Sequence, residues 1–159
     1  MLAAAYDRPV ARFALLLALA LPLTASAGTT SFQFFQTPSH NIGCAYSTSP
    51  QHLRCDIRTG LKPPPPKPKG CQNDWTFGYQ LSGRGPARWG AGFFIGERGR
   101  ASVVCASGAI NFPPQTTLRY GQTWRKLGGF SCTSRKSGLT CRNKNGHGFF
   151  LSKEPSRRF

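Results

Sequence analysis

Six cysteines restrict the possible folds of this chain more than any other feature of its sequence. An even number of cysteines in a small exported chain is typical of a disulfide framework, because a small core alone provides little stability. Zinc is the alternative, but zinc sites usually take two cysteines from a Cys-x2-Cys pair, and the sequence contains none. The cysteines therefore predict disulfides and no metal, and no other pattern indicates a cofactor.

Four of the cysteines belong to two copies of one pattern. Each copy is an apolar-x-Cys segment, a polar turn and a second apolar-x-Cys segment, at residues 42–44 and 53–55 and again at residues 130–132 and 139–141. Residues two apart in a strand share a face. Each copy therefore predicts a β-hairpin with both cysteines on its buried side.

Cysteines that face each other across such a hairpin lie near the Cα separation of about 5.5 Å that a disulfide tolerates. The pairs expected on this basis are Cys44–Cys55 and Cys132–Cys141, with Cys71–Cys105 as the remainder. Six cysteines allow about 15 connectivities, so this pairing is a hypothesis.

The rest of the chain also has the patterns of strands. Alternating or short apolar runs occur at residues 75–81, 93–95, 101–105, 118–124 and 149–151. Eighteen glycines and thirteen prolines leave no room for a long helix after the leader. The prediction is an all-β fold, a small disulfide-stapled antiparallel sandwich or barrel with short strands and many turns.

Residues 1–27 have the pattern of a secretory signal peptide. Arg8 and Arg12 precede an apolar run at residues 13–23. The small residues that signal peptidase requires follow and end at Ala27, so we place cleavage after Ala27. A membrane anchor is the alternative, but the run has 11 residues, and a spanning helix needs about 20. We therefore expect a secreted or periplasmic protein in which residues 28–159 form a single β domain that does not span the membrane.

Charge is the other strong feature of the composition. The chain has a formal net charge of +16; the leader holds two arginines and one aspartate, so 19 basic and four acidic residues remain, a net charge of +15. Such a surface attracts polyanions. The alternative is that the high charge only keeps the protein soluble. Since the sequence has no dedicated nucleic-acid motif, the charge favours an anionic polymer or lipid surface as the partner.

Two segments between the hairpins have compositions of their own. Residues 63–68 are almost all proline and predict an extended crossing between two parts of the sheet, or else a docking ligand for an aromatic groove. Residues 82–92 predict a basic loop, where arginine beside tryptophan either binds an anion or is simply solvated. The anion-binding candidates are Arg84, Arg88 and Trp89 in this loop, and Arg142 and Lys144 at the second hairpin.

The sequence assigns no catalytic residue. Acid–base hydrolysis needs two suitably placed carboxylates, and the four acids after the leader are scattered among arginines. The cysteines are expected to be oxidised, and no phosphate-binding loop, Gly-x-Ser-x-Gly or His-Glu-x-x-His motif is present. His147, in a glycine-rich turn, is either a base or ligand, or an ordinary turn histidine without a partner. An enzyme such as a hydrolase is therefore the less favoured class.

Several segments form a distinctive series. In order they are Thr37-Pro38-Ser39-His40-Asn41-Ile42-Gly43-Cys44, Leu53-Arg54-Cys55-Asp56-Ile57-Arg58, Gly60-Leu61-Lys62-Pro63-Pro64-Pro65-Pro66, Gly129-Phe130-Ser131-Cys132, Gly138-Leu139-Thr140-Cys141 and Gly146-His147-Gly148-Phe149. The series resembles a family of small secreted bacterial proteins classed as a domain of unknown function, over nearly all of the chain after the leader. The resemblance implies export and a common fold, and it brings no catalytic residues.

Two functions agree with these features. The first is a non-catalytic domain that binds an anionic polymer or surface of the envelope or the extracellular space. The second is a secreted inhibitor or protein-interaction module that presents a rigid loop to a protein partner, since a preorganised loop loses little entropy on binding.

Overall fold

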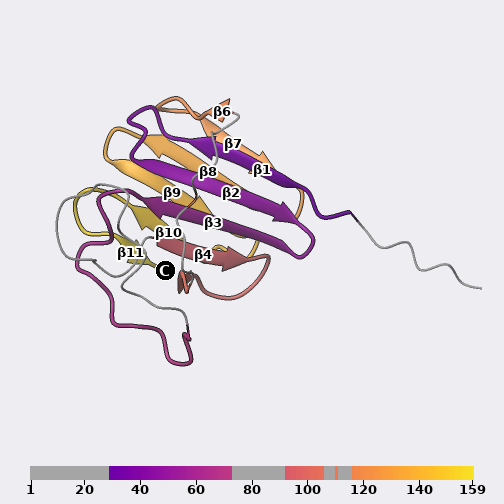
Figure 1. Ribbon diagram of the computed structural model, residues 1–159. Coiled ribbons are helices and arrows are strands. Elements are labelled where there is room, and N and C mark those ends of the chain that lie inside the picture. Colours follow the sequence, from indigo (N-terminus) through magenta and orange to yellow (C-terminus); the bar gives the residue numbers. More distant parts are fainter. Residues whose placement is uncertain (1–28, 73–91, 106–109, 111–115) are drawn as a thin grey trace, which may run out of the picture.

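The structure, a computed structural model, describes residues 29–72, 92–105, 110 and 116–159. These residues form eleven strands and no helix (Figure 1). The strands are β1 (Phe32–Gln36), β2 (Ile42–Thr48), β3 (Gln51–Ile57), β4 (Gly92–Gly96), β5 (Ser102–Val103), β6 (Thr116–Thr117), β7 (Thr123–Lys126), β8 (Phe130–Arg135), β9 (Gly138–Arg142), β10 (Gly148–Leu151) and β11 (Arg157–Arg158).

Some expectations fall on residues outside this part of the chain. They are the signal peptide, the alternating run at 75–81, and Arg84, Arg88 and Trp89 of the basic loop. A search of the described residues finds no helix that is both long and apolar enough to cross a membrane.

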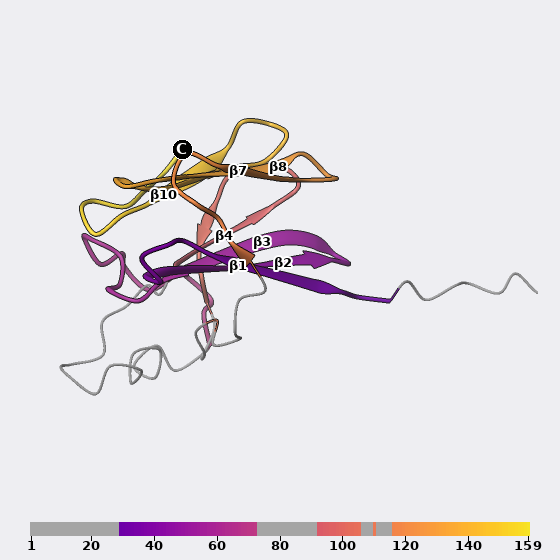
Figure 2. The same ribbon diagram turned by 90° about the horizontal axis from the view of Figure 1, so that it is seen from above.

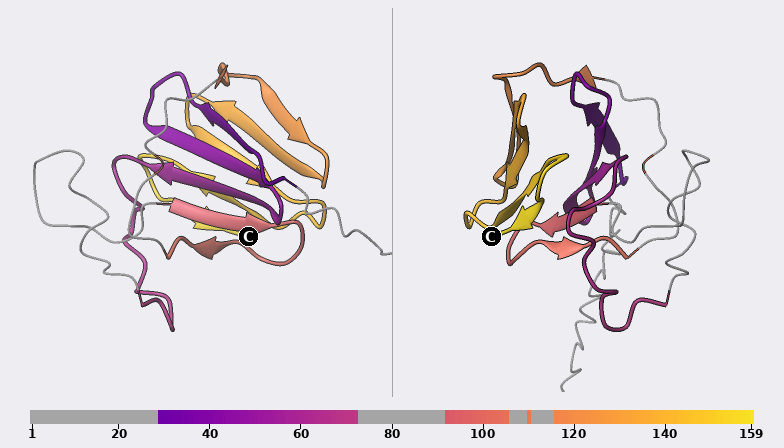
Figure 3. Two further views of the ribbon diagram at one scale, coloured as in Figure 1. Left: turned by 45° about the vertical axis from the view of Figure 1, so that its right-hand side comes forward. Right: turned by 90° about the vertical axis from the view of Figure 1, so that its left-hand side faces the viewer.

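The strands form two sheets that face each other as a sandwich (Figures 2 and 3). Sheet A has the order β5-β4-β3-β2-β1-β6, and sheet B has the order β11-β10-β9-β8-β7. All neighbouring pairs are antiparallel except β1 and β6, which are parallel. The sheets stay separate, so the all-β prediction holds as a sandwich and not as a closed barrel.

Each sheet contains one meander of five consecutive strands, with a cysteine hairpin at its centre. In sheet A, Cys44 of β2 is directly opposite Cys55 of β3. In sheet B, Cys132 of β8 is directly opposite Cys141 of β9. The two hairpins predicted from the repeated pattern therefore occupy equivalent places in the two layers.

The equivalence extends to the next strand in each sheet. Phe93 of β4 is opposite Cys55, and Phe149 of β10 is opposite Cys141. Gly92 and Gly148 precede these phenylalanines, and a Cβ at either glycine would collide with the carbonyl oxygen of the cysteine on the neighbouring strand. Glycine is thus required at both places by the close approach of the adjacent backbone.

The core lies between the two sheets and contains both hairpin disulfides. The structure has disulfides Cys44–Cys55, Cys71–Cys105 and Cys132–Cys141, the same three pairs as in the sequence hypothesis. Across the sandwich, the Sγ atoms of Cys55 and Cys141 are 4.0 Å apart, and the rings of Phe93 and Phe149 have centroids 5.6 Å apart. The large side chains with almost no exposed surface are Phe35, Leu53, Ile57, Ile95, Phe130, Leu139, Phe149 and Leu151.

The run at residues 118–124 is not one strand. Leu118 is buried, but a turn follows at Tyr120 and Gly121, and β7 begins only at Thr123. Gly121 has φ of +86°, a left-handed conformation that glycine adopts without strain and that interrupts an extended strand. This turn carries the chain from the edge of sheet A into sheet B.

Residues 63–68 lead from the end of β3 to Cys71 without regular secondary structure. Just before them, the carbonyl oxygen of Lys62 accepts a hydrogen bond of 2.7 Å from the backbone N–H of Ser156, near the start of β11. The chain that enters the polyproline segment is therefore attached to the C-terminal edge of sheet B.

Candidate anion-binding face

The outer side of sheet B carries four arginines among hydroxyl side chains. In β8, Phe130 and Cys132 are buried in the core, so the alternation of the strand places Ser131, Thr133 and Arg135 on the outer side. The other strands continue this surface, which we call the basic face: Thr123, Arg125, Ser131, Thr133, Arg135, Thr140, Arg142, Phe150 and Arg157.

The strand register aligns these residues in rows across the sheet. In one row, Arg125 of β7 is opposite Ser131 of β8, which is opposite Arg142 of β9. Neighbouring strands are about 4.8 Å apart, so the two arginine positions are separated by about 10 Å. The next row takes one residue from each of the five strands: Thr123, Thr133, Thr140, Phe150 and Arg157. Cations and hydroxyls are thus repeated at strand spacing.

Two of the four guanidinium groups are held by aromatic rings. Arg142 lies 4.4 Å from the ring centroid of Phe159 and donates a hydrogen bond of 3.1 Å to the carbonyl oxygen of Gly146. Arg157 lies 4.9 Å from the ring centroid of Phe150. A stacked guanidinium keeps its charge and its outward N–H donors, and it has less freedom to lose when it binds an anion.

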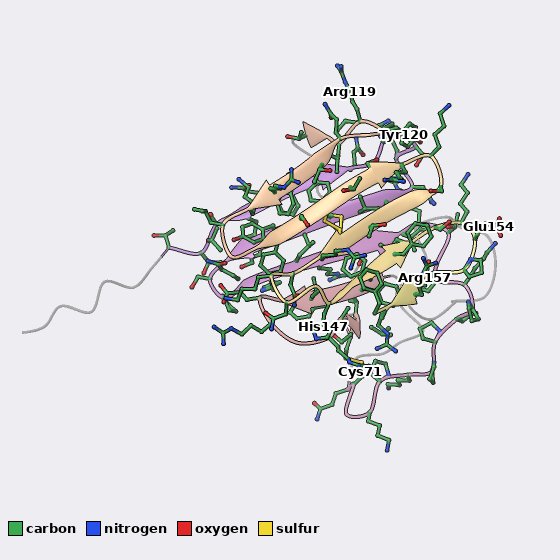
Figure 4. The ribbon with its side chains drawn as sticks, turned by 180° about the vertical axis from the view of Figure 1, so that it is seen from behind. Cys71, Arg119, Tyr120, His147, Glu154 and Arg157 are labelled. Atoms are coloured by element: carbon green, nitrogen blue, oxygen red, sulfur yellow. A yellow bond between two sulfur atoms is a disulfide. The ribbon has the colours of Figure 1, made fainter. Side chains whose placement is uncertain are left out.

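No described acidic residue lies on the basic face. The described acids are Asp56, Glu97 and Glu154. Glu97 pairs with Lys144 at 3.8 Å, and Glu154 lies in the turn between β10 and β11. Figure 4 shows the molecule from the side of sheet B, with Arg157 on the sheet and Glu154 at its margin. None of the described aspartate and glutamate side chains therefore pairs with an arginine of the basic face.

The equivalent position in sheet A has the opposite charge. Asp56 directly follows the core cysteine of β3, as Arg142 follows the core cysteine of β9. The Asp56 carboxylate accepts hydrogen bonds of 3.0 and 2.7 Å from Nε and Nη2 of Arg54, and one of 2.9 Å from the N–H of Ile110. At this position the outer side of sheet A has the Arg54–Asp56 ion pair. Sheet B has Arg142, which forms no ion pair with a described acidic side chain.

Arg142 and Lys144, the two anion-binding candidates at the second hairpin, have different surroundings in the structure. Arg142 is on the basic face, whereas Lys144 lies in the following turn and reaches Glu97 of sheet A. Lys144 therefore contacts an acidic side chain of the other layer, whereas Arg142 forms no ion pair with a described acidic side chain.

His147 has no arrangement for catalysis among the described residues. Its backbone carbonyl oxygen accepts a hydrogen bond of 2.9 Å from the N–H of Asn143, and its ring makes no hydrogen bond with a described residue. The described cysteines are all in disulfides. The sulfur atoms of Cys55, Cys132 and Cys141 lie within 4.8 Å of one another, but as disulfide sulfurs they are not metal ligands.

Arg125, Arg135 and Arg157 were not among the candidates taken from the sequence. The alternation of β8 contains the signal for Arg135, because it is two residues beyond Thr133 on the outer side. The sequence holds no such signal for Arg157, whose face is decided by the pairing of the short β11 with β10.

Comparison with known proteins gives one match. The model of a family described as "Family of unknown function (DUF6636)" matches residues 13–159. No curated protein matches the chain, and no solved structure matches it.

Proposed function

We propose that this chain, which belongs to the family of unknown function DUF6636, is a non-catalytic domain that binds an anionic polymer or surface through the basic face. The observation that carries the proposal is the set of four arginines on one side of sheet B, with no described acid among them. Closely spaced cations attract a polyanion, and its repeated charges engage several of them at once.

The contrast between the two sheets supports this assignment. The halves share the buried cysteine hairpin and the following Gly-Phe-Phe strand, as their common role in the core requires. Their outer sides differ, because sheet A has the Arg54–Asp56 pair, whereas the described charged side chains on the outer side of sheet B are all arginines. The arginines of the basic face are aligned in rows across one sheet, an arrangement that suits an extended anion and that solubility alone does not require.

Three disulfides indicate that the protein functions in an oxidising environment, extracellular or periplasmic. Export by a signal peptide cleaved after Ala27 is part of the proposal. The anion would then be a component of the envelope or of the extracellular space.

Binding of the mature chain to heparin and to vesicles with anionic headgroups, at about 150 mM salt, tests the proposal. The variant to compare replaces Arg125, Arg135, Arg142 and Arg157 with glutamine. With about 0.5 kcal/mol for each exposed ion contact, the four changes together should weaken binding about 30-fold.

The matched control removes four other exposed cations, Lys62, Lys67, Lys69 and Arg98, and so has the same net charge. It should bind much more tightly than the basic-face variant, and both should remain folded in thermal unfolding. Equal losses in the two variants would show that only total charge matters, and no binding of the unaltered chain would contradict the function itself.

A secreted inhibitor or protein-interaction module is the alternative, and no observation on the described residues favours it. A stoichiometric protein partner that stays bound in high salt during a pull-down would support that alternative against the basic face.

A further inference from the structure

A cavity opens beside the basic face, where the edges of the two sheets meet, and shares Arg157 with that face. It has a volume of about 420 Å³ and lies beside β11 and the start of β5. Its lining residues are Leu61, Pro65, Phe93, Arg100, Ala101, Ser156, Arg157, Arg158 and Phe159. This volume is within the range of about 300–1,000 Å³ that is usual for small-molecule sites.

The inner wall of the cavity is apolar. Leu61 and Phe93 are each 4 % exposed, and Ala101 is 5 % exposed. These side chains belong to three different segments: the chain after β3, β4, and the residue before β5. An apolar substituent in the cavity would therefore lose its hydration against a wall that the fold already builds.

The cavity also has cationic walls. Arg158 is opposite the buried Phe149 in the register of β11 and β10, so it lies on the inner side of sheet B, unlike Arg157. Its Nη1 donates a hydrogen bond of 3.4 Å to the carbonyl oxygen of Ala101, and its guanidinium lies 6.0 Å from the ring centroid of Phe93. Arg158 thus spans the gap between the sheets beside the apolar wall.

Arg100 adds a second charge from sheet A. It is exposed, and it makes no hydrogen bond or ion pair with a described residue. No described residue that lines the cavity is an aspartate or glutamate, and neither Arg100 nor Arg158 forms an ion pair with a described acidic side chain. Guanidinium groups match the geometry of carboxylates and phosphates, with which they form paired charge-assisted hydrogen bonds.

The geometry points to a second binding site, in which this cavity takes one small amphipathic anion with its apolar body against Phe93 and Leu61 and its carboxylate or phosphate head at Arg100 and Arg158. The ligand differs from the polyanion of the basic face in size and in its need for an apolar part. The site goes beyond the proposed function, although Arg157 borders both.

The probes for this site are octanoate, octyl phosphate, octanamide and inorganic phosphate. Calorimetric titration of the whole mature chain should detect octanoate or octyl phosphate, and the stronger of the two identifies the head group. Octanamide, which keeps the apolar body without the charge, should bind about tenfold more weakly, the ratio expected for one charge-assisted hydrogen bond. Inorganic phosphate, which lacks the apolar body, should not bind measurably.

Arg100→Gln is the variant that tests the position of the site, because an exposed side chain without a described partner can be replaced without loss of the fold. It should weaken binding of the amphipathic anion about tenfold. Arg98→Gln, an exposed arginine that does not line the cavity, is the matched control and should leave binding unchanged.

The outcomes of the two sites can be told apart. Arg100→Gln should leave heparin and vesicle binding unchanged, and Arg125→Gln with Arg135→Gln should leave octanoate binding unchanged. Equal binding of octanoate and octanamide, equal effects of Arg100→Gln and Arg98→Gln, or no binding of either amphipathic anion would each overturn the inference, whatever the result for the polyanion.

Discussion

The guanidinium of Arg142 stacks on the ring of Phe159, 4.4 Å from the ring centroid, and so joins β9 to the residue that follows β11. A Cβ on Gly148 would come 3.0 Å from the same ring, so the glycine leaves room for it beside Arg142. One of the four cations of the basic face is therefore oriented by the end of the chain, with Gly146 accepting its hydrogen bond on the other side.

Phe159→Leu should weaken binding of the polyanion about two- to fivefold while the net charge stays the same. The stacking of an arginine on an aromatic ring contributes about 0.5–1 kcal/mol, and without the ring Arg142 must lose more freedom when it binds. Heparin affinity chromatography measures the effect. Phe32→Leu, at a 52 % exposed phenylalanine of sheet A, is the control and should leave the elution salt concentration unaltered.

Asn143→Ala should lower the free energy of unfolding by about 1–3 kcal/mol. The Asn143 amide nitrogen donates hydrogen bonds of 3.2 and 2.9 Å to the carbonyl oxygens of Gly96, at the end of β4, and of Gly99, in the turn between β4 and β5 of sheet A. Asn143 is 4 % exposed, so its loss leaves these carbonyl oxygens without that donor. Urea denaturation gives the change, and Asn145→Ala at an exposed site should cost much less; equal costs would contradict the role of this contact between the sheets.

Tyr46 should make the stability of the protein fall at high pH. Burial, and to a smaller extent the charge of Glu97, raises the pKa of Tyr46 above its ordinary value of 10.0. The pKa of Tyr46 is thus higher in the folded protein than in the unfolded chain, where it is 10.0. The stability that the protonated Tyr46 contributes is therefore complete below pH 10.0, and it is lost as the pH rises through the pKa of the folded state. The free energy of unfolding should therefore decline less steeply above this pH in Tyr46→Phe than in the unaltered protein.

The same variant loses the hydrogen bond of 3.2 Å that the Tyr46 hydroxyl donates to the carbonyl oxygen of Leu127, so at neutral pH it should be less stable by about 1 kcal/mol. Urea denaturation at several pH values separates the two effects. Tyr120→Phe, at a 40 % exposed tyrosine, should follow the unaltered protein throughout. Parallel decline of all three proteins would contradict the assignment to Tyr46.

Replacement of Cys71 and Cys105 by serine should destabilise the protein by about 4 kcal/mol. This disulfide closes a segment of 34 residues, compared with 11 and 9 for the two hairpin disulfides, and the entropy that a cross-link removes from the unfolded chain grows with the length closed. Urea denaturation measures the loss. Peptide mapping without reduction checks the connectivity, and a peptide that joins Cys44 to Cys132 would contradict it.

The two hairpins could be predicted because their signals are local. Alternation in β2, β3, β8 and β9 identifies the side of each strand that is buried, and the facing cysteines are only 11 and 9 residues apart. The all-β class follows from the same alternation together with the glycine and proline content. The polar side of the second hairpin also led to Arg142, which the structure places on the basic face.

Predictions that depended on residues far apart in the chain were less successful. Leu118 and Trp124 were expected in one strand, but they lie on either side of the turn at Gly121. Lys144 has the polar position expected for it, but its partner is Glu97, in the turn that follows β4 of the other sheet. An acid brought close by the packing of the layers cannot be recognised from the neighbours of Lys144 in the sequence.

The sequence by itself determined which side of each central strand enters the core, because side chains alternate with a period of two wherever a strand forms. Only the tertiary structure decided where the remaining cations lie. The pairing of β11 with β10 puts Arg157 on the basic face and Arg158 beside Phe93, and the meeting of the two sheet edges brings Arg100 to the same cavity. A strand of two residues is too short to show an alternation of apolar and polar side chains. Which of its two side chains points to the core is therefore decided by its register with the neighbouring strand and by the layer that packs against it.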